Sequence, residues 1–310
     1  MRTIKRQLMD DRLFLWHARA SQKPHFHGGV RSPPLSAHID ALDFELPKLT
    51  KPGRVTFEVS TLAGDMAAAI HVHALGAPGS PVLIYHHDAH EFPPSQTLRA
   101  MFPATRSSEL TVYLIEAPFH HARSGAQVAA TSLMLHLAVQ AVAIGATERL
   151  LLSPRAAQAS VRVVAGFGHG GFITNRHHML YDTATAYVPF MAGTAEAELH
   201  LSSRPTAKRA LREQSELRSL LDFNEAWAER GHGNVFPVLG SADLVNPFEA
   251  AMRSYGDTKI EVWAMSHQAA KKSPQRMREK ILRHIRDLQI ERGEVFEMPA
   301  PRRSAFLGRS

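Results

Sequence analysis

Two side chains late in the sequence have the types and the spacing of a general acid–base pair. Asp243 follows the strand-like run VFPVLG, and His267 follows the strand-like run IEVWAM. A carboxylate that orients an imidazole makes the histidine an effective general base. Their separation of 24 residues leaves room for one helix between two neighbouring strands. The pair therefore predicts proton-transfer chemistry at one edge of a sheet.

A glycine-rich turn earlier in the chain has the surroundings of a nucleophile but no nucleophile. Residues 161–167 (VRVVAGF) predict a buried strand, and a helical pattern begins after GHGG. The motif G-x-S-x-G places a serine on a sharp turn between a strand and a helix. Gly166 and Gly170 match this motif, and Gly168 stands where the serine would be. Glycine relieves a strain of about 1–3 kcal/mol that a residue with a Cβ atom would carry there.

The order of turn, acid and histidine resembles the α/β-hydrolase superfamily over residues 50–292, in the pieces PVLIYHH, EAPFH, VVAGFGHGGF, VLGSAD and SHQ. The resemblance implies an α/β fold with a doubly wound, mostly parallel, eight-stranded sheet and a helical cap insertion. It also implies a triad that acts on esters, amides or related acyl compounds, with Gly168 replacing the nucleophile of that triad.

The resemblance further implies an oxyanion hole, in which the first donor is the N–H group after the nucleophile position, here that of His169. The second donor comes from a loop that commonly contains His-Gly, whereas this chain has His87 and Asp88. A carboxylate at this point would repel an oxyanion unless Asp88 points away from the site.

Three functional hypotheses follow. The first is a hydrolase-like protein with a degenerate triad, which lacks conventional serine-hydrolase activity and keeps a pocket for a small acyl or ester-type ligand or an interaction role. The second is an active hydrolase or lyase-like enzyme in which His267 and Asp243 act as a general base without an acyl-enzyme. The third is an NAD(P)-binding oxidoreductase, because Gly166, Gly168 and Gly171 fit G-x-G-x-x-G. The next predicted strand, YVPFMAG, lacks the acidic residue that this fingerprint requires.

The elements that must position these residues are alternating strand-like and helix-like segments. A hairpin is predicted at residues 54–73, one long helix at 125–145 and an amphipathic helix at 274–291. The predicted organisation is an irregular N-terminal arm (1–45), an α/β-hydrolase core (46–193 and 233–295), a helical cap (194–232) and a flexible basic tail (296–310).

The sequence contains 19 histidines, so metal binding must be considered. His86, Asp88 and His90 alternate at a strand end and could share one face, near His120, His121 and His169. Because no stiff helical spacing supports a ligand set, we expect neither a metal nor another cofactor.

The composition excludes other classes. With no cysteine, the chain has no disulfides, thiolate catalysis or cysteine-based zinc sites. No apolar run reaches the length of a membrane span, and no secretory signal is visible, which predicts a cytoplasmic protein without a membrane partner. The net charge is +7, but the basic residues are scattered, so a nucleic-acid partner is not expected. The expected partner is a small acyl or ester-type molecule, and a homodimer is left open.

Overall fold

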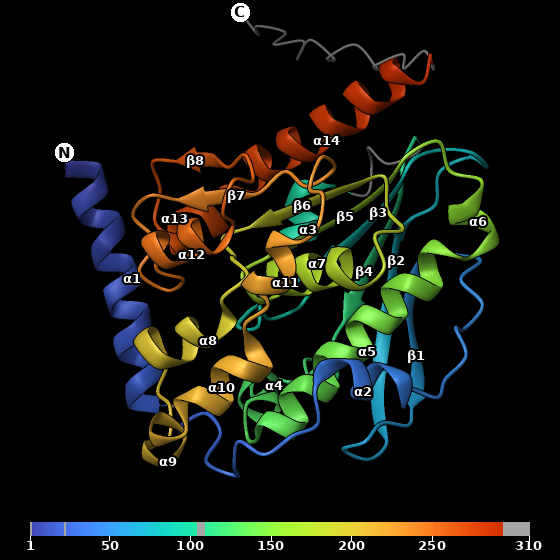
Figure 1. The fold of residues 1–310 in the computed structure, drawn as a ribbon. Coiled ribbons are helices and arrows are strands. Elements are labelled where there is room, and N and C mark those ends of the chain that lie inside the picture. The colour runs from blue at the N-terminus through green and yellow to red at the C-terminus, as the bar shows by residue number, and fades with distance from the viewer. Residues whose placement is uncertain (1, 22, 104–108, 294–310) are drawn as a thin grey trace, which may run out of the picture.

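An eight-stranded sheet forms the centre of the computed structural model, which describes residues 2–21, 23–103 and 109–293 (Figure 1). The strand order is β1-β2-β4-β3-β5-β6-β7-β8. β1 pairs with β2 and β2 pairs with β4 in antiparallel fashion, and the other neighbouring pairs are parallel. The strands are β1 (Gly53–Val59), β2 (Met66–Ala74), β3 (Val82–His86), β4 (Thr111–Glu116), β5 (Arg162–Phe167), β6 (Ala186–Phe190), β7 (Val238–Gly240) and β8 (Glu261–Trp263). The predicted hairpin and the doubly wound, mostly parallel sheet are confirmed.

Helices cover both faces of the sheet, and alternate strand residues point to opposite faces. Val82, Ile84 and Val164 pack in one hydrophobic cluster with residues of α5 and α7. Leu83 and Tyr85 pack in the other cluster with residues of α3 and α14. The helices of the core are α2 (Leu35–Asp40), α3 (Gln96–Met101), α4 (Gly125–Ala129), α5 (Leu133–Leu151), α6 (Pro154–Ala157), α7 (His169–Leu180), α12 (Phe248–Ser254), α13 (His267–Lys271) and α14 (Pro274–Glu291).

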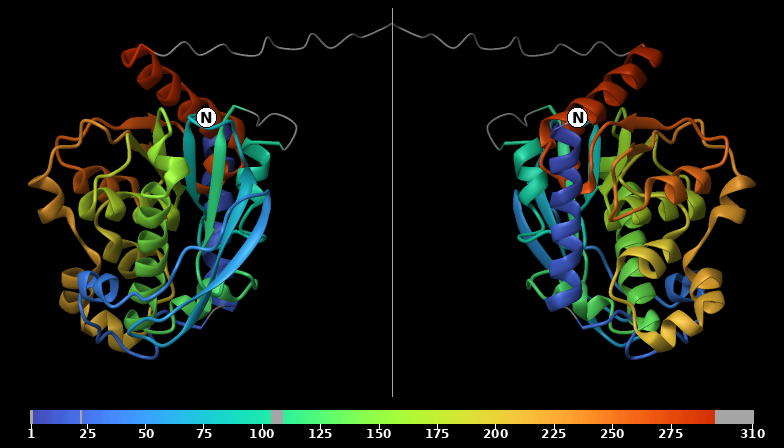
Figure 2. Two further views of the ribbon diagram at one scale, coloured as in Figure 1. Left: turned by 90° about the vertical axis from the view of Figure 1, so that its right-hand side faces the viewer. Right: turned by 90° about the vertical axis from the view of Figure 1, so that its left-hand side faces the viewer.

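The expectation of an irregular segment at the N-terminus is wrong for residues 2–21, which form helix α1 (Arg2–Ser21). This helix lies on the outside of the molecule, at the left in Figure 1 and facing the viewer in the right panel of Figure 2. It packs against α13. Asp11 and Ala18 are buried, and they lie on one face because they are seven residues apart. The sequence does not predict this helix because an acidic residue, Asp11, lies in the middle of its buried face.

The prediction of a single helix at residues 125–145 is also wrong, because the structure has two helices there, α4 and α5. Ser132 lies at the break in an extended conformation, and its side chain accepts a hydrogen bond from the N–H group of Leu135 (3.2 Å). A serine in this position is a favourable helix N-cap, and it starts α5 anew.

Residues 194–232, the predicted cap, contain short helices and no regular strand. These are α8 (Glu196–Glu198), the π-helix η2 (Leu199–Ser203), α9 (Lys208–Arg212), α10 (Gln214–Leu221) and α11 (Asn224–Ala228). The predicted tail at 296–310 lies outside the described residues. None of the helices in the described ranges combines the length and the apolar character that crossing a bilayer requires.

Candidate functional site

The predicted acid–base pair is assembled. Asp243 follows β7 and His267 begins α13, directly after β8. Nδ1 of His267 lies 2.9 Å from Oδ2 of Asp243, and both side chains are buried. The other oxygen of Asp243 accepts hydrogen bonds from the N–H groups of Val245 and Asn246, both 2.8 Å long. These bonds fix the carboxylate, which in turn orients the imidazole ring.

The glycine-rich turn has the strained geometry of a nucleophile elbow. Gly168 lies between β5 and α7 with φ 56° and ψ −115°, a conformation that favours glycine. A Cβ atom at this position would lie 3.4 Å from Cε1 of His267. The same Cβ atom would lie only 2.5 Å from Oδ1 of Asp88. Asp88 therefore points into the site, and its carboxylate fills the space beside His267 that a nucleophile would need.

Asp88 is part of a buried charge network. Its Oδ2 atom pairs with Nζ of Lys271 at 2.8 Å. Burial favours the neutral carboxyl, but the positive charges of Lys271 and His267 hold the pKa of Asp88 well below its usual range. Burial likewise opposes protonation of His267, yet Asp243 and Asp88 raise the pKa of this imidazole above its ordinary value. His267 therefore binds its proton more strongly than a histidine with the ordinary pKa does.

The other glycines of the turn allow close packing of α7 on the sheet. A Cβ atom on Gly166 would lie 2.2 Å from the carbonyl oxygen of Gly170, and one on Gly170 would lie 2.2 Å from that of His86. A Cβ atom on Gly171 would lie 2.6 Å from Cβ of Ala192. Protein atoms therefore surround these glycines. The carboxylate of Asp88 also lies on the turn, where it would repel an anionic pyrophosphate. This arrangement disfavours NAD(P) binding.

Helix α1 contributes a residue to the site that the sequence did not reveal. Asp11 is fully buried and accepts hydrogen bonds from the N–H groups of His267 (3.1 Å), Gln268 (2.9 Å) and Leu244 (3.1 Å). The first two of these N–H groups belong to the first turn of α13, which has no intrahelical acceptors for them. A carboxylate also complements the positive end of the helix. Asp11 thus joins the segments that carry Asp243 and His267.

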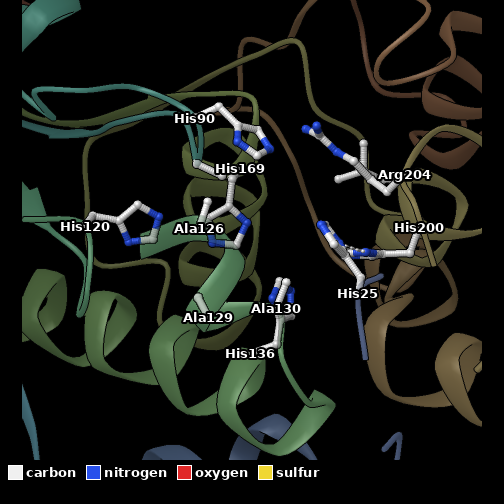
Figure 3. A pocket seen from close by; sticks show the side chains of 12 residues that line it. His25, His90, His120, Ala126, Ala129, Ala130, His136, His169, His200 and Arg204 are labelled. Atoms are coloured by element: carbon white, nitrogen blue, oxygen red, sulfur yellow. Dashed lines mark hydrogen bonds between the residues drawn. The ribbon is translucent and has the colours of Figure 1, made fainter. Parts of the chain in front are cut away.

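A pocket lies beside the turn and is lined mainly by histidines (Figure 3). Core elements contribute one side of it, and the N-terminal segment and the cap contribute the other. Its polar lining consists of His25, His90, His120, His136, His169, His200 and Arg204. Three alanines, Ala126, Ala129 and Ala130, form part of the remaining wall. Neither Gly168 nor His267 lines this pocket, so the pocket is displaced from the triad position toward the cap.

One cationic side chain, that of Arg204, lies among the residues that line the pocket. Among the described residues, no carboxylate forms an ion pair with the guanidinium of Arg204, which is buried and points across the pocket (Figure 3). Nη1 of Arg204 has no hydrogen-bond partner there. The buried Nε2 atoms of His25, His120 and His200 are also without partners. Burial lowers the pKa of Arg204, and the negative charges of Asp88 and Asp243 offset only part of this effect.

The remaining predicted residues lie at the rim of these two regions. Nδ1 of His87 is 2.9 Å from the carbonyl oxygen of Asp88, and its ring packs on that of His120 at 4.8 Å. The ring of His169 faces the pocket, and Nδ1 lies 3.8 Å from Glu196.

The metal candidates of the sequence are not brought together. Nε2 of His86 contacts Thr147 at 2.9 Å, Asp88 pairs with Lys271, and the ring of His90 packs on Phe14. Within residues 2–21, 23–103 and 109–293, one group of three potential metal donors lies close together, namely His136, His169 and Glu196.

Comparisons with known proteins agree with the topology. The acetyl xylan esterase 1 of Thermoanaerobacterium sp. superposes with a TM-score of 0.50 at 14% identity, over 75% of this chain and 85% of the esterase. An acylaminoacyl peptidase of Pyrococcus horikoshii superposes with a TM-score of 0.51 at 12% identity, over 82% of this chain. This chain covers 44% of the peptidase. No protein-family model and no curated protein sequence matches the chain. At these identities the likeness concerns the fold.

Proposed function

Because the chain has the α/β-hydrolase fold, we propose that it lacks conventional serine-hydrolase activity and binds a small acyl-type ligand in its histidine-lined pocket. The observation that carries this proposal is the position of Asp88. Its Oδ1 atom lies 2.5 Å from the place of a Cβ atom on Gly168, so a carboxylate from another loop occupies the space that a serine side chain would need. A negative charge beside the turn also opposes the developing oxyanion of acyl transfer.

The guanidinium of Arg204 in the lining of the pocket supports an anionic ligand. Arg204 offers a buried guanidinium without a carboxylate partner, and such a group binds planar anions through paired hydrogen bonds. The unpartnered Nε2 atoms of His25, His120 and His200 can accept or donate further hydrogen bonds. A short carboxylic acid, which is the acyl half of an ester, has the charge and the planar anionic group that a guanidinium binds.

The first experiment measures hydrolysis of p-nitrophenyl acetate by the unmodified protein, by Gly168→Ser and by Gly168→Ser with Asp88→Gly. We expect the unmodified protein and the single variant to be inactive, because Asp88 obstructs the serine. The double variant should gain activity of at least about tenfold over the unmodified protein, and His267→Ala should remove this gain. Hydrolysis by the unmodified protein that depends on His267 would refute the proposal.

The second experiment measures binding of acetate and propionate by calorimetry. Arg204→Met should weaken binding by about tenfold or more, since a hydrogen-bonded charge pair contributes about 1.5–3 kcal/mol. Arg209→Met is the matched control, because Arg209 is exposed and pairs with Glu213 on the cap surface. Equal binding by Arg204→Met and the unmodified protein would contradict the assignment of the pocket.

A second candidate function is hydrolysis without a serine nucleophile, and the intact 2.9 Å contact between His267 and Asp243 favours it. In this case His267 would act as a general base toward water or a bound substrate. A screen of lactone and haloalkane substrates distinguishes the candidates, because turnover abolished by His267→Ala supports this function alone.

A further inference from the structure

We propose that His136, His169 and Glu196 form a binding site for a divalent transition-metal ion at the wall of the pocket. The three residues come from three different elements, namely α5, the first turn of α7 and the first residue of α8 in the cap. Their donor atoms lie within 4.8 Å of one another, and all three side chains are buried. Metal binding here is independent of whether the triad position is active.

One of the distances between donor atoms matches that between two ligands of one ion, and a second is somewhat longer. Two ligands at about 2.0–2.1 Å from a metal lie about 2.9 Å apart at a right angle and about 3.4 Å apart at the tetrahedral angle. Nε2 of His136 is 2.9 Å from Oε1 of Glu196, and Nδ1 of His169 is 3.8 Å from the same oxygen. The first distance fits adjacent ligands, and the second requires a small movement of one side chain.

Short polar contacts join the carboxylate of this cluster to its neighbours. Nε2 of Gln140 lies 2.6 Å from Oε1 of Glu196 and 2.9 Å from Nε2 of His136, so three polar atoms form a triangle. With a proton on its Nε2 atom, His136 donates to Oε1 of Glu196, which also accepts from the amide of Gln140. With the amide of Gln140 reversed, its oxygen would face the carboxylate instead. A bound metal ion would take the place of the proton on Nε2 of His136 and leave the bond from Gln140 to Glu196 intact.

The surroundings provide the supporting contacts that metal ligands require. Nη2 of Arg176 binds Oε2 of Glu196 at 3.2 Å, which fixes the carboxylate and leaves Oε1 directed toward the two histidines. On the pocket side, the unpartnered nitrogen atoms of His120 and His200 belong to side chains that are only 2% exposed. The ring of His136 packs against the rings of His169 and His200, with centroid distances of 5.4 and 5.3 Å. A water molecule or an anion bound to the ion would lie within this polar lining.

The donor set indicates the class of metal. Two imidazoles and one carboxylate suit Zn²⁺, Fe²⁺ and Co²⁺, whereas Mg²⁺ and Ca²⁺ prefer oxygen ligands. Three protein ligands leave positions for water or a small anion, as in open metal sites. The metal ion would thus lie in the wall of the pocket. An anionic ligand would approach the ion from the pocket side.

The test is a titration of the chelator-treated full-length protein with Co²⁺, followed by its visible ligand-field absorption and by competition with Zn²⁺. We expect saturation at one Co²⁺ per chain. Glu196→Gln and His169→Ala should each weaken binding by at least about 100-fold, because each removes a direct ligand. His25→Ala is the matched control, since His25 lines the same pocket but lies outside the donor group.

Three results would overturn the site: no saturable binding at one equivalent, unchanged binding by Glu196→Gln, or an equal loss in His25→Ala and His169→Ala. If a variant fails to fold by circular dichroism, X-ray absorption spectroscopy of the Zn²⁺-loaded unmodified protein decides instead. Two imidazole nitrogens and carboxylate oxygen at about 2.0–2.2 Å support the site. Coordination by oxygen alone refutes it.

Discussion

The folded protein buries several histidines in their neutral form. Acidification should therefore destabilise it at a pH at which most carboxylates are still ionised. Burial is the largest cause that lowers the pKa of His25 and of His87 to about 3, and neighbouring positive groups add to it. In the unfolded chain both histidines titrate near pH 6.5. Below pH 6.5 the unfolded state therefore binds more protons than the folded state, and the free energy of unfolding falls as the pH falls toward 3.

The size of this effect follows from the two pKa values. At pH 5 an unfolded histidine with a pKa near 6.5 gains about 2 kcal/mol from protonation, so His25 and His87 together remove about 4 kcal/mol of stability. This is a large part of the total of about 5–15 kcal/mol for a typical domain. His267 acts in the opposite direction. Its raised pKa gives a stabilisation that is present below pH 6.5 and is lost as the pH rises through the folded value.

Urea unfolding at pH 7.5 and pH 5.0, followed by tryptophan fluorescence with a chelator present, measures the difference. Trp227 and Trp263 are buried and report on the folded core. We expect the free energy of unfolding to fall by several kcal/mol between the two pH values, because other buried histidines with lowered pKa values add to the effect of His25 and His87 while His267 opposes it. His87→Gln should reduce this pH dependence by about 2 kcal/mol. A free energy of unfolding that is the same at both pH values would refute the reasoning.

Two further substitutions test the contacts around the triad position. Asp11→Ala should lower the free energy of unfolding by about 2–3 kcal/mol in urea titrations, because it leaves three backbone N–H groups without their charged acceptor. Asp10→Ala is its control and should cost at most about 0.5 kcal/mol, since Asp10 forms an exposed pair with Lys272. Gly168→Ala should destabilise by about 1–3 kcal/mol through its positive φ, and the contact with Asp88 adds to this cost. In the Gly168→Ala variant, adding Asp88→Ala should recover the part of the loss that comes from the clash with Asp88. If the losses of the two single variants simply add in the double variant, as measured by thermal melts, the clash does not contribute.

The core of the fold was predictable because its signals are local. Buried parallel strands give continuous apolar runs, and the positions of Asp243 and His267 directly after such runs fixed their place at the same sheet edge. The elbow at Gly168 was predictable for the same reason, since strand, turn and helix are adjacent in the sequence. These predictions needed no knowledge of contacts between distant segments.

The contacts that define the site are long-range, and no local pattern encodes them. The position of Asp88 against Gly168 depends on the pairing of β3 with β5 and on the salt bridge to Lys271. Likewise, Glu196 is one of several acidic residues in a charged segment, and only the folded cap brings it to His136. A charged segment predicts a solvated surface, so the sequence gives no sign that Glu196 within it is fully buried.

The bond between helix α1 and α13 has a consequence for the synthesis of the chain. Asp11 leaves the ribosome long before its partners, because the N–H groups of His267 and Gln268 lie 256 and 257 residues later. At about 5–20 residues per second, this interval lasts about 10–50 s. During that time water solvates the carboxylate, and α1 has no helix to dock against. The acid–base pair therefore reaches its final geometry only after Gln268 has been translated, and an early stop codon that removes α13 would also release the first helix.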